Sequence, residues 1–355
     1  KTGKSCLIIT GLYSALLSSN VWSKNIKISG EVMLDHDSFD AGFMEDNEIS
    51  QKMSEIRRAR LGFKTALTDD WKAKLKIDFS DDNAEIKDAY IKYQGWEWAD
   101  ITIGKQKEGF GLERLTSSSD TLMIERSMVT SALAPGRSLG INLSGDQVNF
   151  NWQLGYFQPD ENENTSAITG RFAWLPWRQE NELVHIGIAF SERDLNGIEH
   201  RINERMEIHT ADSLIEGNNI LASKESLQGI ELLWQQSGIT ALAEWQQSTV
   251  TDTSNAEYDY QGGFLQVSYQ LSGENRQYKK GVLGSVASSG WELTSRYSEF
   301  ELVEEAHKVE TYSIGLNYTV NKNLKFMANY INAEQFYDDK ELKDNAIALR
   351  VQYTF

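Results

Sequence analysis

The last fourteen residues of the chain decide its fold class. Residues 342–355 read Leu-Lys-Asp-Asn-Ala-Ile-Ala-Leu-Arg-Val-Gln-Tyr-Thr-Phe. Successive side chains of an extended strand point to opposite faces. One face of this strand therefore carries Ile347, Leu349, Val351, Tyr353 and Phe355, and the other carries Ala348, Arg350, Gln352 and Thr354. The pattern predicts a strand with one apolar and one polar surface.

The same alternation recurs along most of the chain. In residues 71–79, one face carries Trp, Ala, Leu, Ile and Phe, and the other carries three Lys and one Asp. With the last strand, such segments number about sixteen, and many approach the roughly 9–11 residues of a tilted membrane-spanning strand. They are 26–34, 56–67, 71–79, 84–93, 101–105, 139–143, 148–157, 167–174, 183–190, 230–234, 239–245, 258–271, 291–297, 311–320 and 324–331.

The connections between these segments fall into a short and a long set. Short polar turns are expected at 68–70, 144–146, 236–238 and 321–323. Long polar connections are expected at 35–55, 106–137, 191–228 and 272–290. Short turns at one end and long loops at the other are typical of an outer-membrane barrel, whose long loops lie outside the cell.

The composition fits one large β domain. The chain has 355 residues, of which 40% are hydrophobic and three are Pro, and no apolar run approaches the roughly 18 residues of a membrane-spanning helix. The net charge of −17 argues against a nucleic-acid-binding protein. The single cysteine, Cys6, excludes a disulfide framework and, lying in the expected leader, leaves the mature chain without a thiolate nucleophile or metal ligand.

The first residues resemble a secretory signal peptide. Lys1 and Lys4 precede an apolar run at 7–17, and small or Val residues follow shortly before Lys24. We expect a signal peptide at 1–23 and one barrel domain at 24–355. The terminal aromatic of the last strand also resembles the C-terminal signal of outer-membrane barrels, although a soluble β-sandwich could end in the same way.

The segment 56–63 is the most informative internal stretch, because it contains three arginines. Arg58 and Arg60 share a face, whereas Arg57 points the other way unless the strand is irregular. An arginine facing lipid costs roughly 2–4 kcal/mol near the bilayer midplane. The arginines are therefore expected to face water, either in the lumen or at a solvated strand end.

From this stretch onward the chain resembles the phosphate-selective porin O and P family. The resemblance covers nearly all of the expected mature chain and is most specific in its Phe-Gly-Leu-Glu, Thr-Ser-Ser and Glu-Arg series. The motifs that carry it are 57–61 (Arg-Arg-Ala-Arg-Leu), 70–72 (Asp-Trp-Lys), 87–90 (Lys-Asp-Ala-Tyr), 104–105 (Gly-Lys), 110–113 (Phe-Gly-Leu-Glu), 116–118 (Thr-Ser-Ser), 123–126 (Met-Ile-Glu-Arg) and 134–137 (Ala-Pro-Gly-Arg).

The resemblance implies a trimeric, sixteen-stranded channel of the Gram-negative outer membrane, in contact with lipid and lipopolysaccharide. Its third long loop, here 106–137, would fold into the lumen and narrow the pore. The implied solutes are small anions, with phosphate and polyphosphate as the candidates, and no cofactor or metal is implied. The residues that match the family's anion-binding positions are Arg57, Arg58, Arg114 and Arg126, with Arg205 near a further position.

Some residues depart from the family pattern and leave other functions open. Family arginines fall on Glu31, Asn203 and His209, although Arg201 and Arg205 lie nearby. A carboxylate at a constriction weakens anion attraction, because the charge of the lining sets the preference of a pore. A general or cation-preferring porin is therefore the main alternative.

A barrel enzyme is the second alternative, but the sequence offers little for one. It would need a Ser/His or Asp/His group at a barrel mouth. His185 is the only histidine expected on a strand away from a loop, and we interpret it as a lumen side chain. The sequence therefore predicts a non-enzymatic channel.

Overall fold

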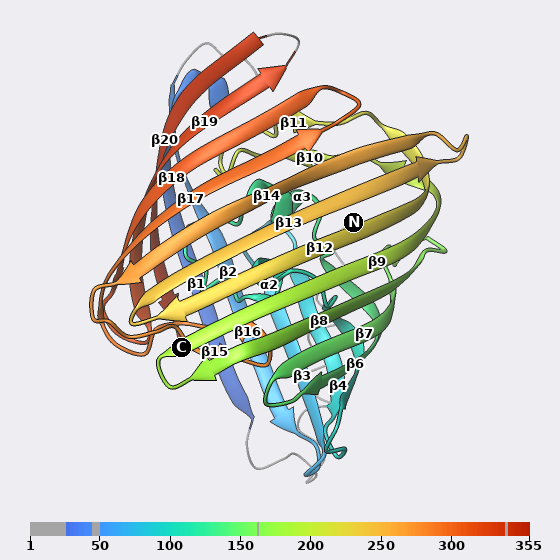
Figure 1. Cartoon of the computed structure of the whole chain (residues 1–355), viewed down its shortest axis with the longest axis vertical. Coiled ribbons are helices and arrows are strands. Elements are labelled where there is room, and N and C mark those ends of the chain that lie inside the picture. Colours follow the sequence, from blue (N-terminus) through green and yellow to red (C-terminus); the bar gives the residue numbers. More distant parts are fainter. Residues whose placement is uncertain (1–25, 45–49, 162, 338–339) are drawn as a thin grey trace, which may run out of the picture.

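The computed structural model describes residues 26–44, 50–161, 163–337 and 340–355. Within these ranges sixteen antiparallel strands pair in sequence order and close into one barrel (Figure 1). The prediction of an antiparallel barrel of about sixteen strands is confirmed. The expected signal peptide at 1–23 lies outside the described residues.

Strands form nearly all of the wall, and the helices are short. The barrel strands are β1 (Lys27–Phe39), β2 (Gln51–Ala66), β3 (Trp71–Asp78), β4 (Glu85–Tyr93), β5 (Asp100–Lys107), β6 (Arg137–Asp146), β7 (Phe150–Gln158), β8 (Ser166–Gln179), β9 (Glu182–His200), β12 (Ile220–Gln236), β13 (Ile239–Asp252), β14 (Glu257–Gln270), β17 (Gly290–Leu302), β18 (His307–Thr319), β19 (Leu324–Tyr337) and β20 (Lys340–Thr354). The remaining elements are η1 (Ala41–Phe43), α2 (Leu112–Leu115), α3 (Met128–Ala132) and two small hairpins, β10 (Asn203–Glu204) with β11 (Ile215–Glu216) and β15 (Tyr278–Lys279) with β16 (Val282–Leu283). No helix in the described ranges is both long and apolar enough to cross a membrane.

The C-terminal strand closes the barrel against β1. Val32 pairs with Tyr353 and Leu34 with Val351 in an antiparallel register. At the end of this ladder the backbone N–H of Gly30 donates to the carbonyl of Phe355 at 2.9 Å, and the N–H of Phe355 donates to the carbonyl of Gly30 at 3.1 Å. A Cβ atom on Gly30 would lie 2.2 Å from the Phe355 ring. The terminal aromatic therefore packs directly over Gly30, and a larger residue at this position would displace the ring.

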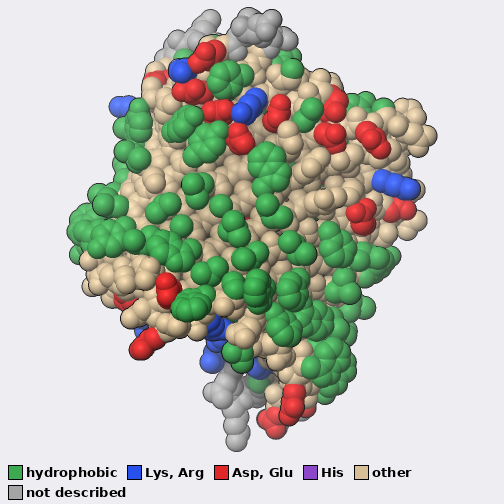
Figure 2. Space-filling model, viewed as in Figure 1, with side chains coloured by type: hydrophobic (Ala, Val, Ile, Leu, Met, Phe, Trp, Pro, Cys, Tyr) green, Lys and Arg blue, Asp and Glu red, His purple; other side chains and the backbone are tan. Residues whose placement is uncertain are grey.

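The two faces of each strand meet different surroundings, as the sequence predicted. On β20, Leu349 is 43% exposed and Val351 39%, whereas Arg350 between them is 2% exposed. Outward apolar side chains form a band across the strands in Figure 2, and acidic side chains lie mostly toward its upper end. A barrel satisfies its backbone hydrogen bonds by closing on itself, and so it can present such a band to lipid.

One predicted connection lies at the wrong end of the barrel. The long segment expected at 272–290 does connect two strands, β14 and β17. Counting strands along the closed barrel, however, places it beside the short turns 67–70, 147–149 and 237–238 rather than beside the other long loops. The predicted separation of short turns from long loops is therefore wrong here, because a polar composition does not reveal at which end a connection lies.

The connection between β5 and β6, residues 108–136, contacts inward side chains around the barrel. Its Ile124 N–H donates to Asn329 of β19 at 2.8 Å, and its Glu113 N–H donates to Glu244 of β13 at 2.5 Å. On the same segment Met128 and Val129 of α3 are fully buried within an apolar cluster that includes inward residues of β14 and β17. The segment is thus hydrogen-bonded to two strands, β13 and β19, that are not neighbours in the barrel.

Candidate functional site

A β-bulge places two arginines side by side on the inner surface of β2. Met33 of β1 pairs with Arg58, but the next residue, Leu34, pairs with Ile56, so Arg57 is an extra residue in the ladder. Two residues of the bulged strand then oppose one on the partner, and the normal alternation of faces breaks. Arg57 and Arg58 both reach residues of the β5–β6 connection. The sequence analysis allowed Arg57 to share a face with Arg58 only if the strand is irregular, and this bulge is the irregularity.

Arg57 and Arg58 border a strongly basic cavity of about 700 Å³ inside the barrel. Its lining contains twelve Lys and Arg side chains and only four Asp and Glu, although the whole chain carries a net charge of −17. Arg114 and Arg126 from the β5–β6 connection also line it. The structure therefore brings together four of the five arginines singled out from the sequence.

Sequence reasoning missed most of the other cations of this cavity. They are Arg60, Lys74, Lys76, Lys87, Lys92, Lys107, Arg137 and Lys280. The signal was present in β3, where every second residue from Lys72 to Lys76 is a lysine. The other face of this strand is apolar and would face lipid, so the lysine face indicates a basic wall of the lumen.

Three cations of the β5–β6 region are held by backbone carbonyls. Lys107 Nζ donates to the carbonyls of residues 114, 115 and 116 at 2.6, 3.0 and 3.1 Å. Arg114 Nε donates to Pro135 O at 3.0 Å, and Arg126 Nη2 donates to Thr116 O at 2.9 Å. In the part of the chain that the structure describes, no carboxylate forms an ion pair with Lys107, Arg114 or Arg126, so their charges remain uncompensated at close range.

The environment of Arg114 favours an added anion. Burial, together with the like charges of Arg126 and Arg137, lowers the pKa of Arg114 to about 9. The group remains protonated at neutral pH, but its charged form is unfavourable there. An anion in the cavity would relieve this repulsion, because an opposite charge nearby stabilises the ionised form.

Arg205 lies apart from this cavity. It belongs to the connection between β9 and β12, residues 201–219, and its Nε donates to Ala211 O at 2.9 Å. Its neighbour Arg201 is exposed and pairs with Glu216 at 2.6 Å. His209, at another family arginine position, lies 2.8 Å from Glu55. The structure does not place Arg205 with the other four arginines.

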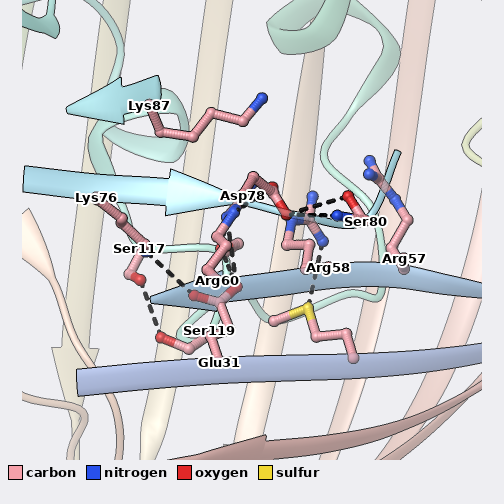
Figure 3. A network of polar contacts seen from close by, with 12 residues as sticks. Glu31, Arg57, Arg58, Arg60, Lys76, Asp78, Ser80, Lys87, Ser117 and Ser119 are labelled. Atoms are coloured by element: carbon pink, nitrogen blue, oxygen red, sulfur yellow. Dashed lines mark hydrogen bonds and ion pairs between the residues drawn. The ribbon is translucent and has the colours of Figure 1, made fainter. Parts of the chain in front are cut away.

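Glu31, the carboxylate that argued against an anion channel, is paired with cations (Figure 3). Its oxygens lie 3.4 Å from Arg60 and 3.2 Å from Lys76, and Ser118 donates to it at 2.7 Å. Arg60 also pairs with Asp78 at 2.6 Å. Glu31 is 5% exposed and does not itself line the cavity, but its partners Arg60 and Lys76 do, so its charge offsets part of the positive charge of the lining.

A second carboxylate, Glu125, binds the strand arginines directly. Arg57 donates to its two oxygens at 2.9 and 3.0 Å, and Arg350 of β20 donates at 2.7 Å. Arg58 is further away, at 3.9 Å. Burial alone would raise the pKa of Glu125, but Arg57, Arg58 and Arg350 outweigh burial and hold that pKa well below its usual range.

His185 is a buried wall residue. Its Nδ1 lies 2.6 Å from the Tyr278 hydroxyl oxygen, and its Nε2 lies 3.1 Å from Glu231. Glu231 is itself paired with Arg171 at 2.6 Å. Across the described ranges, no group of three or more His, Cys, Asp and Glu side chains is arranged to hold a metal ion. We therefore interpret His185 as part of the packing of the β14–β17 connection.

Comparison with known proteins agrees with this architecture. The family model of phosphate-selective porin O and P matches residues 26–355. Porin O of Pseudomonas aeruginosa is 24% identical, over 93% of this chain and 88% of that protein. Two solved structures share the fold: an anion-selective porin from Comamonas acidovorans (TM-score 0.64, 11% identity, 93% of this chain and 99% of that one) and OmpT of Vibrio cholerae in its trimer form (TM-score 0.62, 11% identity, 94% and 100%). The chain belongs to the phosphate-selective porin O and P family, and it is accordingly an outer-membrane channel of a Gram-negative bacterium rather than an enzyme.

Proposed function

We propose that the channel conducts small anions, with phosphate among them, through the basic cavity beside β2–β6. The observation that carries this proposal is the charge of the lining, twelve cations against four carboxylates. Fixed charge of one sign in a narrow, low-dielectric passage concentrates ions of the opposite sign and sets the preference of the pore. Arg114 and Arg126 would act directly on the anion, because neither forms an ion pair with a carboxylate among the residues that the structure describes.

The β5–β6 connection would form the constriction. Its hydrogen bonds to β13 and β19, and its contacts with β2, support a position across the lumen. Its apolar packing against β14 and β17 fills that side of the interior and would leave the β2–β6 wall for solutes. In the same proposal, Arg205 would act further out, on the β9–β12 connection.

Trimerisation and contact with lipopolysaccharide are further parts of the proposal. The OmpT neighbour is described in a trimer form, which supports a homotrimer here. On the outer surface His36 Nδ1 lies 2.8 Å from Ser54 Oγ among exposed apolar side chains. A polar pair is disfavoured against lipid, so this surface would suit contact with another subunit. Electrophoresis without heating, compared with heated samples, would reveal a trimer that resists detergent.

Single-channel recording in planar bilayers tests the proposed solute. We expect a reversal potential of anionic sign under a KCl gradient, and block of the chloride current by phosphate. Arg114→Ala and Arg126→Ala should each reduce the block. Cation preference without phosphate block would overturn the proposal and favour the general or cation-preferring porin.

A further inference from the structure

We propose that Glu125 occupies, as a built-in carboxylate ligand, an anion site formed by Arg57, Arg58 and Arg350, and so weakens the binding of the permeating anion. The inference rests on the proposed anion conduction and concerns how tightly the pore holds its solute. Arg350 is a new member of the site. It comes from β20, at the opposite end of the chain from Arg57 and Arg58.

The geometry is that of a ligand in a binding site. Arg57 donates through Nε and Nη2 to the two oxygens of Glu125, at 2.9 and 3.0 Å, which is the bidentate arrangement of guanidinium with carboxylate or phosphate. Arg350 adds a third bond at 2.7 Å. Two strands thus supply the donors, while the carboxylate arrives from a separate segment, the β5–β6 connection.

Within contact distance, the cations of this site outnumber its carboxylates. Both oxygens of Asp35 are used by Arg350, at 2.7 and 2.6 Å. Glu125 is then the one carboxylate that faces Arg57 and Arg58 at close range within the described residues. At contact distance, three guanidinium groups therefore share two carboxylates, while a third carboxylate, Glu55, acts on Arg57 from further away.

Arg58 shows that the site holds unused donors. Its side chain is 5% exposed, its Nη1 donates only to the sulfur of Met33 at 3.3 Å, and its Nε has no hydrogen-bond partner among the described residues. A buried guanidinium normally finds strong acceptors, since an unsatisfied buried donor is costly. An anion larger than one carboxylate, with oxygens in several directions, could satisfy Arg57 and Arg58 together.

The site borders the passage. The side chains of Arg57 and Glu125 are 18% and 15% exposed, and Arg57 and Arg58 both line the basic cavity. An anion in the cavity must therefore compete with the carboxylate of Glu125 for these arginines. A tethered ligand competes at a high effective concentration, so removal of its charge should strengthen anion binding.

Glu125→Gln is the decisive variant, because the amide keeps the size of the side chain and removes its charge. We expect phosphate to reach half-block at about a tenfold lower concentration than in the wild-type channel, since a unit charge within about 4 Å of the site is lost. Glu125→Asp, which retracts the carboxylate, should give a smaller gain. Adding Arg58→Gln to Glu125→Gln should abolish the gain.

Asp120→Asn is the matched control. Asp120 lies on the same connection, its side chain accepts from Ser119 at 3.4 Å, and it touches none of the three arginines. Its charge acts on Arg276 and Lys325, which do not line the basic cavity. Loosening of the connection alone would raise conductance in both variants and tighten phosphate block in neither. Unchanged or weaker block in Glu125→Gln and Glu125→Asp, or the same gain in Asp120→Asn, would overturn the inference.

These outcomes separate the inference from the proposed function. If the wild-type channel prefers cations but Glu125→Gln binds phosphate, the proposed solute is wrong and the role of Glu125 stands. If the wild-type channel prefers anions and Glu125→Gln leaves the block unchanged, the proposed function stands and Glu125 is only a structural contact.

Discussion

One inserted residue determines which arginines of β2 face the lumen. In a regular ladder, Arg57 would point to the lipid, at a cost of roughly 2–4 kcal/mol near the midplane. The shift between Met33 and Leu34 places it beside Arg58 instead. The alternation of the sequence predicts Arg58 and Arg60 on one face, but a bulge depends on pairing with β1 and so is not visible in β2 alone.

Arg114→Ala should lower the anion preference of the channel. Arg114 has no carboxylate partner among the described residues, so its charge is available to the solute. We expect the chloride-over-potassium permeability ratio to fall by about two- to tenfold, which corresponds to roughly 0.4–1.4 kcal/mol of ion stabilisation. The reversal potential under a KCl gradient measures this ratio. Arg201→Ala, which removes an exposed arginine paired with Glu216, is the control and should leave the ratio unchanged.

Acidification should not release the arginines held by Glu125. A carboxyl group with a depressed pKa stays ionised until the pH falls through the depressed value, and the pKa of Glu125 lies well below its usual range. The titration of phosphate itself affects all variants alike. The ratio of half-blocking phosphate concentrations between wild type and Glu125→Gln should therefore agree at about pH 7.5 and about pH 5.5. A ratio that approaches one at the lower pH would contradict this prediction.

At the scale of the element, the β14–β17 connection is folded against the inner wall. Arg276 pairs with Glu292 of β17 at 2.6 Å and donates to Asp120 O of the β5–β6 connection at 2.8 Å. Arg171 of β8 donates to Gly281 O at 2.9 Å. These bonds lie at the end of the barrel that carries the short turns. The sequence predicts the polar character of this connection but not its end or its inward fold, which depend on distant partners.

Shortening this connection should widen the channel. Replacement of residues 277–284 by two glycines removes the β15–β16 hairpin and Lys280, while Arg276 keeps its bond to Glu292. We expect a higher single-channel conductance, because less chain occupies the lumen at that end. Tyr278→Phe, which removes only the hydroxyl beside His185, is the control and should conduct as the wild type does. An unchanged conductance in the shortened protein would show that the connection lies off the ion path.

Glu108 fixes the start of the β5–β6 connection to the wall. Its side chain is fully buried and accepts from Ser138 at 2.6 Å, Thr169 at 2.5 Å and Arg193 at 3.1 Å. Glu108→Ala leaves Ser138 without this acceptor and Arg193 with Glu225 alone, at 3.5 Å, and should destabilise the barrel by roughly 1–3 kcal/mol. We expect a lower temperature for heat-induced electrophoretic unfolding and noisier single-channel current. Glu163→Ala, at an exposed site, should change neither.

At the scale of the whole molecule, the sequence predicts the barrel well, because apolar and polar residues alternate within each strand and so mark its outward and inward faces. The face that holds Ile347, Leu349 and Val351 is exposed, and the face that holds Arg350 and Gln352 is buried. The site is predicted less completely. Arg57, Arg58, Arg114 and Arg126 came from resemblance, whereas Glu125 joins them through its contact with Arg57, 68 positions away, and Arg350 through its contact with Glu125, 225 positions away.

The chain can have an acidic net charge and a basic cavity because many of its acidic side chains lie on the outer surface of the barrel. Glu299, Glu301 and Glu310 share the outward face of β17 and β18 with Tyr297 and Tyr312, and Lys308 lies 3.1 Å from Glu299 and 2.7 Å from Glu310. Figure 2 shows acidic side chains near the same end of the outer surface. The charge of −17 therefore does not describe the pore.

If the lining sets the selectivity, anion preference should depend on ionic strength in a defined way. The Debye length falls from about 10 Å at about 0.1 M salt to about 3 Å at about 1 M, so charges that do not touch the ion are screened at the higher concentration. We expect the chloride-over-potassium permeability ratio to be larger at about 0.1 M than at about 1 M KCl, and to remain above one at both. The double variant Glu301→Gln and Glu310→Gln removes outward charge and should follow the wild-type curve, because these carboxylates lie across the barrel wall from the cavity. If the permeability ratio changed as much in the double variant as in Arg114→Ala, the charges of the outer surface would determine the selectivity instead.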